Sequence, residues 1–137
     1  MPRLDDCHEQ VVRALQKDGW VVRDKPLRIR TNLRAVHIDI EATRNTNGSS
    51  QHILLAEIKC FPDRKSTTAE LYIAVGQYVI YRAILAEANM AIPLYLAVPE
   101  IIYNTIFDST VRGAISDNNI KMIIVNLETE TITQWIE

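Results

Sequence analysis

Hydrophobic and polar positions alternate with two different periods along the chain, and these periods predict helices and strands in mixed order. Apolar residues at helical spacing predict a helix over residues 4–18, ended by Gly19, and a long helix over residues 69–88. Runs of β-branched and aliphatic residues predict strands at 20–30, 34–43, 52–60, 92–98, 121–126 and 131–136. Turn-forming residues predict a turn at 31–33 and a loop at 44–51, and short helices are expected at 99–108 and 109–118. We expect one α/β domain over residues 1–137, with a mixed β-sheet flanked by helices.

The long helix over residues 69–88 has almost no polar face. A helix that is apolar all round is buried, either in the core of its own domain or under a partner subunit. A homodimer is one assembly that would cover it.

Three charged residues interrupt predicted strands: Asp39 within residues 36–40, and Glu57 and Lys59 within residues 54–60. Because side chains alternate between the faces of a strand, Glu57 and Lys59 point the same way. Buried charges are costly unless they are paired or bind a metal. The alternative without a functional site is a solvated polar strand face around Asp39 and a strand end that reaches solvent at Lys59.

These residue types suit phosphodiester chemistry. Asp39 and Glu57, with the main-chain carbonyl of Ile58, offer the hard oxygen ligands that Mg²⁺ or Mn²⁺ prefers. Such a metal lowers the pKa of a bound water and neutralises charge on the phosphate. Lys59 is expected to orient or deprotonate that water, or to stabilise the transition state. The spacing therefore predicts a metal-dependent hydrolytic site.

Overall composition bounds the function only loosely. The chain has 137 residues, is 47% hydrophobic and carries a net charge of −2, so no global basic field points to nucleic acid. Residues 1–69 hold 12 Lys/Arg against nine Asp/Glu, whereas residues 70–137 hold three against eight. Within the basic half, Arg28, Arg30 and Arg34 could contact DNA phosphates or serve only as a solubilising surface.

Two cysteines, Cys7 and Cys60, lack the spacing of a zinc site. The first ten residues do not read as a signal peptide, and no apolar run is long enough to span a membrane. We therefore expect a cytoplasmic protein with reduced thiols.

The order of helix, hairpin, Glu-x-Lys strand and helix resembles the PD-(D/E)xK nuclease superfamily, with Ile38 in place of its frequent proline. The resemblance implies a restriction-endonuclease-like fold. It also implies a metal-binding carboxylate on the first helix, which Glu9 could supply, or His8 in its place. On the helix after the Glu-x-Lys strand, Gln77 would join the catalytic group. Tyr81 shares its face, although core packing is the alternative for that tyrosine.

A closer resemblance, to the XisH family, covers nearly the whole chain. It is carried by Asp5-x-x-His8, Lys17-Asp18-Gly19-Trp20, residues 36–40, Ala56-Glu57-Ile58-Lys59, Gly76-Gln77-Tyr78-x-x-Tyr81-Arg82, residues 94–99 and Trp135-Ile136. XisH proteins, mostly from cyanobacteria, are known as fdxN element excision controlling factors. The resemblance implies a role in programmed DNA excision beside a site-specific recombinase and an XisI-like partner.

Membership of that family does not by itself imply DNA cleavage, so three hypotheses stay open. The chain is a metal-dependent endonuclease, a non-catalytic accessory factor that works through its partners, or a defence nuclease held inactive by a partner.

Overall fold

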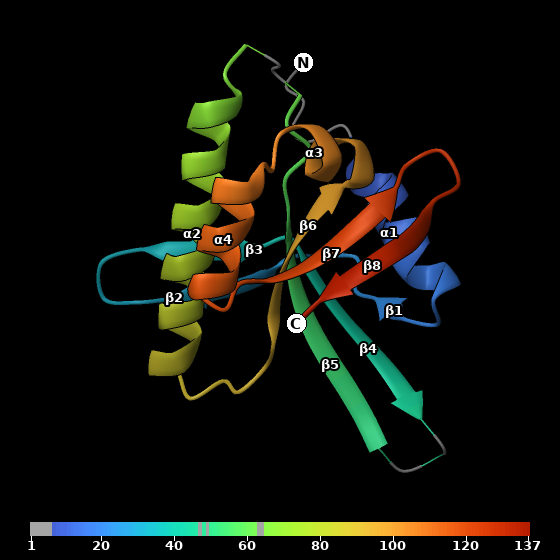
Figure 1. Cartoon of the computed structure of the whole chain (residues 1–137). Helices are drawn as coiled ribbons and strands as arrows, with labels where there is room; N and C mark the ends of the chain where they lie inside the picture. The colour runs from blue at the N-terminus through green and yellow to red at the C-terminus, as the bar shows by residue number, and fades with distance from the viewer. Residues whose placement is uncertain (1–6, 47, 49, 63–64) are drawn as a thin grey trace.

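The structure is a computed structural model that describes residues 7–46, 48, 50–62 and 65–137. Within these residues the main sheet has six strands, which cross the centre of the molecule in Figure 1. Their spatial order is β1 (Val21–Val22), β4 (Ile40–Thr46), β5 (Ser50–Ile58), β6 (Leu94–Pro99), β7 (Lys121–Asn126) and β8 (Thr131–Ile136). Strands β5, β6 and β7 run parallel, and the outer pairs are antiparallel.

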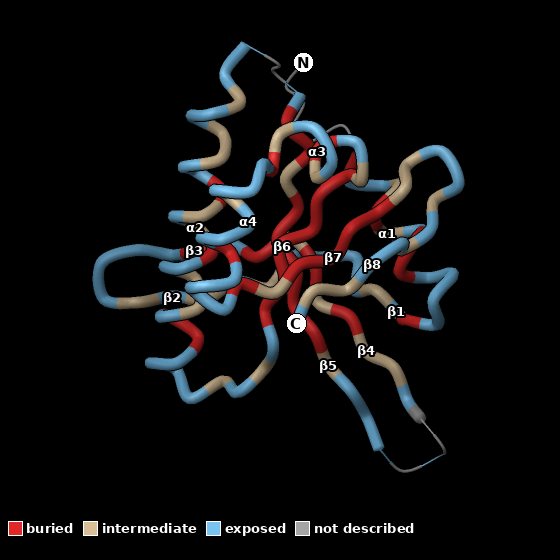
Figure 2. Tube along the Cα trace, in the orientation of Figure 1, coloured by how far each residue is buried: buried red, intermediate tan, exposed pale blue. Residues whose placement is uncertain are grey.

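Helices cover both faces of this sheet, which confirms the predicted α/β architecture (Figure 1). On one face lies α1 (His8–Lys17), and on the other lie α2 (Thr67–Glu87), α3 (Glu100–Thr105) and α4 (Ser109–Asp117). Strand β5 supplies both layers: Leu54, Ala56 and Ile58 pack toward α1, whereas Leu55 packs toward α2. This alternation fits an interior strand, and Figure 2 shows the central strands as the buried part of the molecule.

A second, two-stranded sheet of β2 (Leu27–Arg30) and β3 (Ala35–Ile38) forms a hairpin on the α2 side. The turn at residues 31–34 confirms the predicted hairpin, but the expectation of two continuous strands is wrong. The second strand bends at Asp39 and continues as β4 in the main sheet. Ile38 consequently packs in the α2 layer and Ile40 in the α1 layer, so the two do not share a face as strand alternation predicts.

The remaining boundaries agree closely with the sequence pattern, with one further exception. Helix α1 ends at Lys17, and Gly19 follows with a φ of +94°, a conformation that glycine adopts without steric cost. The expected loop at 44–51 is mostly a hairpin, because β4 runs to Thr46 and pairs there with Ser50. Residues 4–6 of the predicted first helix, Asp5 among them, and residues 47 and 49 lie outside the described part of the chain.

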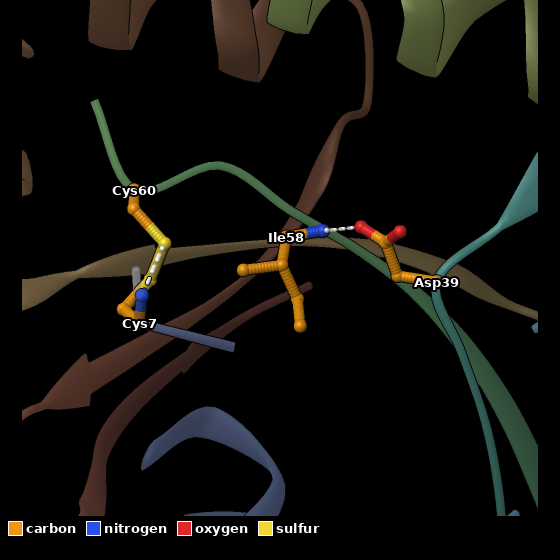
Figure 3. Close-up of a disulfide and its surroundings, with 4 residues drawn as sticks. All are labelled: Cys7, Asp39, Ile58 and Cys60. Carbon is orange, nitrogen blue, oxygen red and sulfur yellow. Dashed lines mark hydrogen bonds between the residues drawn. A yellow bond between two sulfur atoms is a disulfide. The ribbon is translucent and has the colours of Figure 1, made fainter. Parts of the chain in front are cut away.

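The two cysteines form a disulfide, which corrects the expectation of reduced thiols. Cys7 immediately precedes α1 and Cys60 follows β5, so the bond joins the start of the first helix to the end of a central strand (Figure 3). Both residues are buried. The main-chain N–H of Cys7 also donates to Sγ of Cys60 at 3.1 Å.

Candidate active site at the end of the β4–β5 ladder

Asp39 and Glu57 lie opposite each other where the pairing of β4 with β5 ends. The last ladder pair is Ile40 with Ala56, so one further step along both strands places Asp39 across from Glu57. There, carboxylate oxygens accept hydrogen bonds from the main-chain N–H groups in place of main-chain carbonyls. The N–H of Asp39 donates to Glu57 Oε1 at 3.2 Å. The N–H of Ile58 donates to Asp39 Oδ2 at 2.9 Å, as Figure 3 shows. Each carboxylate is thus held by a main-chain donor of the opposite strand.

The electrostatic environment of Glu57 is completed by Lys59. Glu57 is only 6% exposed, and its Oε2 lies 3.9 Å from Lys59 Nζ. The Lys59 side chain is 22% exposed, so it extends from the buried carboxylate toward solvent. The main-chain N–H of Lys59 bonds to the carbonyl of Ala97 in β6, which fixes the backbone beneath this side chain. Pairing of this kind offsets the cost of burying the carboxylate.

Helix α2 directs polar groups toward the same region. The pKa of Tyr81 is raised, first by burial and then by the negative charges of Glu57 and Asp39, which places its phenol within electrostatic reach of both carboxylates. Gln77 lies one turn before Tyr81, and its Oε1 is buried without a hydrogen-bond partner among the described residues. An unpartnered buried acceptor is uncommon and indicates a place for a donor beyond the described residues.

Glu70 is a polar residue of α2 that was not among the site residues predicted from the sequence. Its Oε1 is also buried without a hydrogen-bond partner in the described part of the chain. It precedes Gln77 by seven residues, about two helical turns, so the two lie on the same side of α2. The signal was present in the sequence as one of the few charged residues of a mostly apolar helix.

The structure does not bring the first helix into this group. Helix α1 covers the sheet face opposite to α2, and His8 is exposed. The Glu9 side chain is 84% exposed and its carboxylate lies 3.8 Å from the Arg13 guanidinium. Neither side chain is therefore positioned to join Asp39 and Glu57.

The three arginines of the β2–β3 hairpin are exposed. Arg28 is opposite His37 and Arg30 opposite Ala35, so both point away from the face that packs on the core. Arg34 lies in the turn, next to a groove against α2. In the described ranges, no carboxylate lies within 4.0 Å of any of the three.

The donor set suits one hydrated hard cation. Among the residues that the structure describes, no three Asp, Glu, His or Cys side chains gather into a metal-binding group. Two carboxylates with the Ile58 carbonyl are nevertheless the usual share that a protein gives to Mg²⁺, which keeps several waters. The buried Gln77 Oε1 could accept a hydrogen bond from such a water. The residues present therefore fit the expected Mg²⁺ or Mn²⁺.

One cavity of the structure lies outside the site. It has a volume of about 580 Å³, is lined by Arg82, Met90, Lys121 and their neighbours, and shares no residue with the carboxylate group.

Over the described ranges, none of the helices combines the length and the apolar character needed to cross a bilayer.

Comparison with known proteins places nearly the whole length of the chain in one family. A family model described as XisH protein matches residues 1–133. The crystal structure of an XisH family protein from Nostoc punctiforme PCC 73102 is similar with a TM-score of 0.85 and 36% identity, over 97% of this chain and 100% of that one. The crystal structure of a fdxN element excision controlling factor protein from Anabaena variabilis is similar with a TM-score of 0.82 and 35% identity, over 95% of this chain and 97% of that one. No curated protein matches the sequence. The chain belongs to the XisH family.

Proposed function

We propose that this protein acts in the excision of a fdxN-type DNA element as a metal-dependent endonuclease of the PD-(D/E)xK kind. The relative from Anabaena variabilis, described as a fdxN element excision controlling factor, supports the biological role. The arrangement of Asp39, Glu57 and Lys59 supports the chemistry. A factor that acts on bacterial chromosomal DNA works in the cytoplasm.

The observation that carries the proposal is the pair of hydrogen bonds that hold the two carboxylates: the Asp39 N–H donates to Glu57 Oε1, and the Ile58 N–H donates to Asp39 Oδ2. Because main-chain donors fix both carboxylates, their separation and orientation are set before any ligand arrives. Preorganised charges of this kind lower the reorganisation needed during a reaction. A polar strand end without a ligand would not need two carboxylates held side by side beneath the α2 layer.

Each residue then has a separate task. Asp39, Glu57 and the Ile58 carbonyl would hold Mg²⁺ or Mn²⁺, which supplies an acidified water and neutralises phosphate charge when bound. Lys59 presents a positive charge beside the carboxylates, where it orients the attacking water and stabilises charge on the phosphate oxygens. The Tyr81 phenol, whose pKa is raised by burial and by the charges of Glu57 and Asp39, would donate a hydrogen bond to a phosphate oxygen.

DNA would approach along the exposed arginines of the β2–β3 hairpin. Arg28, Arg30 and Arg34 are exposed and, in the part of the chain described, have no carboxylate within 4.0 Å, so their charges face solvent. Contacts of this type position the backbone without reading sequence.

Cleavage of supercoiled and branched DNA tests the proposal directly. Wild type should cut with Mg²⁺ or Mn²⁺ and not with EDTA. Lys59→Ala and Glu57→Gln should lose at least about 100-fold of that activity, since each removes a charge that acts at the reacting phosphate. Lys121→Ala is the matched control, because Lys121 is also partly buried and lies outside the site. Absence of cutting by wild type, even with an XisI-like partner and a site-specific recombinase added, would contradict it.

A second candidate is a non-catalytic accessory factor that contacts the recombinase or an XisI-like protein. The apolar side chains exposed on α2, Tyr72, Ile73, Val79 and Ile80, favour protein contact. Stable co-purification with either partner, together with a complete lack of cleavage, would support this candidate over the endonuclease.

A further inference from the structure

The hairpin of β4 and β5 extends beyond the other strands of the main sheet (Figure 1). Neighbouring strands flank only its inner part: β1 pairs with β4 at Ala42 and Thr43, and β6 pairs with β5 from Leu55 onward. In the described part of the chain, the strand segments Arg44–Thr46 and Ser50–His52 therefore pair only with each other. We call these two segments the outer ribbon.

Packing within the chain does not explain the outer ribbon. Its residues are all polar, and none of them belongs to either core layer. Asn45, Ser50, Gln51 and His52 are exposed, and Figure 2 shows the outer end of β5 as exposed. An isolated two-stranded hairpin is only marginally stable in water. A polar ribbon that extends into solvent is therefore suited to contact a polar partner.

Two amide side chains of the outer ribbon lie on the same side of the sheet as the candidate site. Leu55 packs in the α2 layer, so Gln51, four residues earlier on β5, points to the same side. Asn45 is directly opposite Gln51 in the ladder and shares its face. Glu57 also lies on this face by alternation, and the β2–β3 hairpin with its arginines packs in the α2 layer. Amides, carboxylate and arginines thus share one side of the sheet.

These two amides suit the recognition of bases. Asparagine and glutamine bind adenine through paired hydrogen bonds to its N6 and N7 in the major groove, which is about 12 Å wide and admits a two-stranded ribbon. Directly opposite residues have Cβ atoms about 5 Å apart, which suits base pairs stacked about 3.4 Å apart. Among the described residues, no hydrogen bond engages the side chain of Asn45 or Gln51. Both amides are available to a ligand.

The charge and the anchoring of the outer ribbon also suit DNA. Residues 42–56 contain no carboxylate, although the chain carries a net charge of −2. Arg44, on the opposite face from Asn45, donates from Nη1 to the main-chain carbonyl of Asp18 at 2.6 Å. Its guanidinium also lies 4.5 Å from the centre of the Trp20 ring. The ribbon is thereby fixed to the body of the protein, and a preorganised contact loses less entropy on binding.

We propose that the outer ribbon lies in the major groove of double-stranded DNA, where Asn45 and Gln51 read adenine. The arginines of the β2–β3 hairpin contact phosphates, so the ribbon supplies the sequence selectivity that they lack. This inference rests on the proposed function, which takes DNA as the substrate. Gln51 precedes Glu57 by six residues, about 20 Å along a strand. The adenines that are read therefore lie roughly six base pairs from the bond that is cut.

Selection from a pool of duplexes with a random core tests the reading in EDTA, where no cleavage is needed. The full chain should enrich duplexes that hold adenine at one or two neighbouring positions. Fluorescence anisotropy then gives the ratio of the Kd values for a scrambled and an enriched duplex. Asn45→Ala combined with Gln51→Ala should lower this ratio at least about tenfold, because adenine loses its hydrogen-bond partners. Arg28→Ala should weaken both duplexes equally and leave the ratio unchanged.

The matched control is Gln16→Ala combined with Asn104→Ala, which removes the same two side-chain types from exposed positions on α1 and α3. It should leave the ratio unchanged. Equal wild-type binding to enriched and scrambled duplexes would overturn the proposal, and so would an equal loss for both duplexes in the ribbon variant. Lost binding to an XisI-like protein in that variant, with the DNA ratio intact, would also overturn it and assign the ribbon to protein contact.

The same reagents separate this inference from the proposed nuclease activity. Adenine selectivity that depends on Asn45 and Gln51, without cutting when Mg²⁺ is added, would support the reading and contradict the nuclease. Cutting without that selectivity would do the reverse. Where both hold, mapped cuts should fall roughly six base pairs from the selected adenines.

Discussion

Reduction of the Cys7–Cys60 disulfide should destabilise the fold strongly. The bond closes a segment with a sequence separation of 53 residues, which includes β1 to β5 and therefore both candidate carboxylates. Closing a loop of that length removes unfolded-state entropy worth about 4 kcal/mol at 25 °C. With a urea m-value of roughly 1.5 kcal/mol/M for a small domain, the unfolding midpoint should fall by roughly 2–3 M on reduction.

Urea unfolding followed by circular dichroism, with and without a phosphine reductant, measures this shift on one sample purified without reductant. The double variant Cys7→Ala, Cys60→Ala is the control, because its midpoint should not respond to the reductant. Alkylation before and after reduction counts the thiols, and the native chain should expose none until it is reduced. Coincident midpoints, or two thiols alkylated in the unreduced protein after unfolding, would show that the reasoning is wrong.

Two further predictions concern the candidate site. Asp39→Ala leaves the Ile58 N–H without its acceptor and should lower the free energy of unfolding by about 1–3 kcal/mol, whereas Asp39→Asn keeps an acceptor oxygen and should cost less; equal losses in urea unfolding would contradict this. The Tyr81 phenol should titrate above its ordinary pKa. Because the fold favours the protonated phenol, its contribution to the free energy of unfolding is fully present below about pH 10 and is lost as the pH rises through the raised pKa. Ultraviolet difference titration measures this pKa, and the Tyr81→Phe variant identifies the signal. In Glu57→Gln the pKa of Tyr81 should move toward 10 without reaching it, since burial is the larger cause of the shift.

The features that sequence reasoning predicted correctly depend on local repetition. Alternation along residues 54–60 placed Glu57 and Lys59 on one face, and the structure confirms that Leu54, Ala56 and Ile58 lie on the other. The long apolar helix and the final hairpin were also predicted close to their observed bounds, because each repeats one period over many residues.

The features that were missed depend on partners far away in the sequence. The bend at Asp39 is held by donors and acceptors on β5, which no pattern within residues 34–43 reveals. The resemblance to PD-(D/E)xK nucleases implied a metal ligand on the first helix, Glu9 or His8, but the sequence pattern of that helix does not say which face of the sheet it covers. The disulfide joins residues 53 positions apart without a recognisable cysteine motif.

The double use of Asp39 constrains how this family can diverge. Its carboxylate both belongs to the proposed catalytic pair and takes over the hydrogen bond of Ile58 where the chain passes from one core layer to the other. A descendant that abandons catalysis would still be under selection to keep an acceptor at this position. Retention of Asp39 in a relative is therefore weak evidence for the proposed activity. Lys59 pairs with the Glu57 side chain but bonds through its side chain to no main-chain group at this junction, so on the proposed function its absence is the better sign that a relative does not cut DNA.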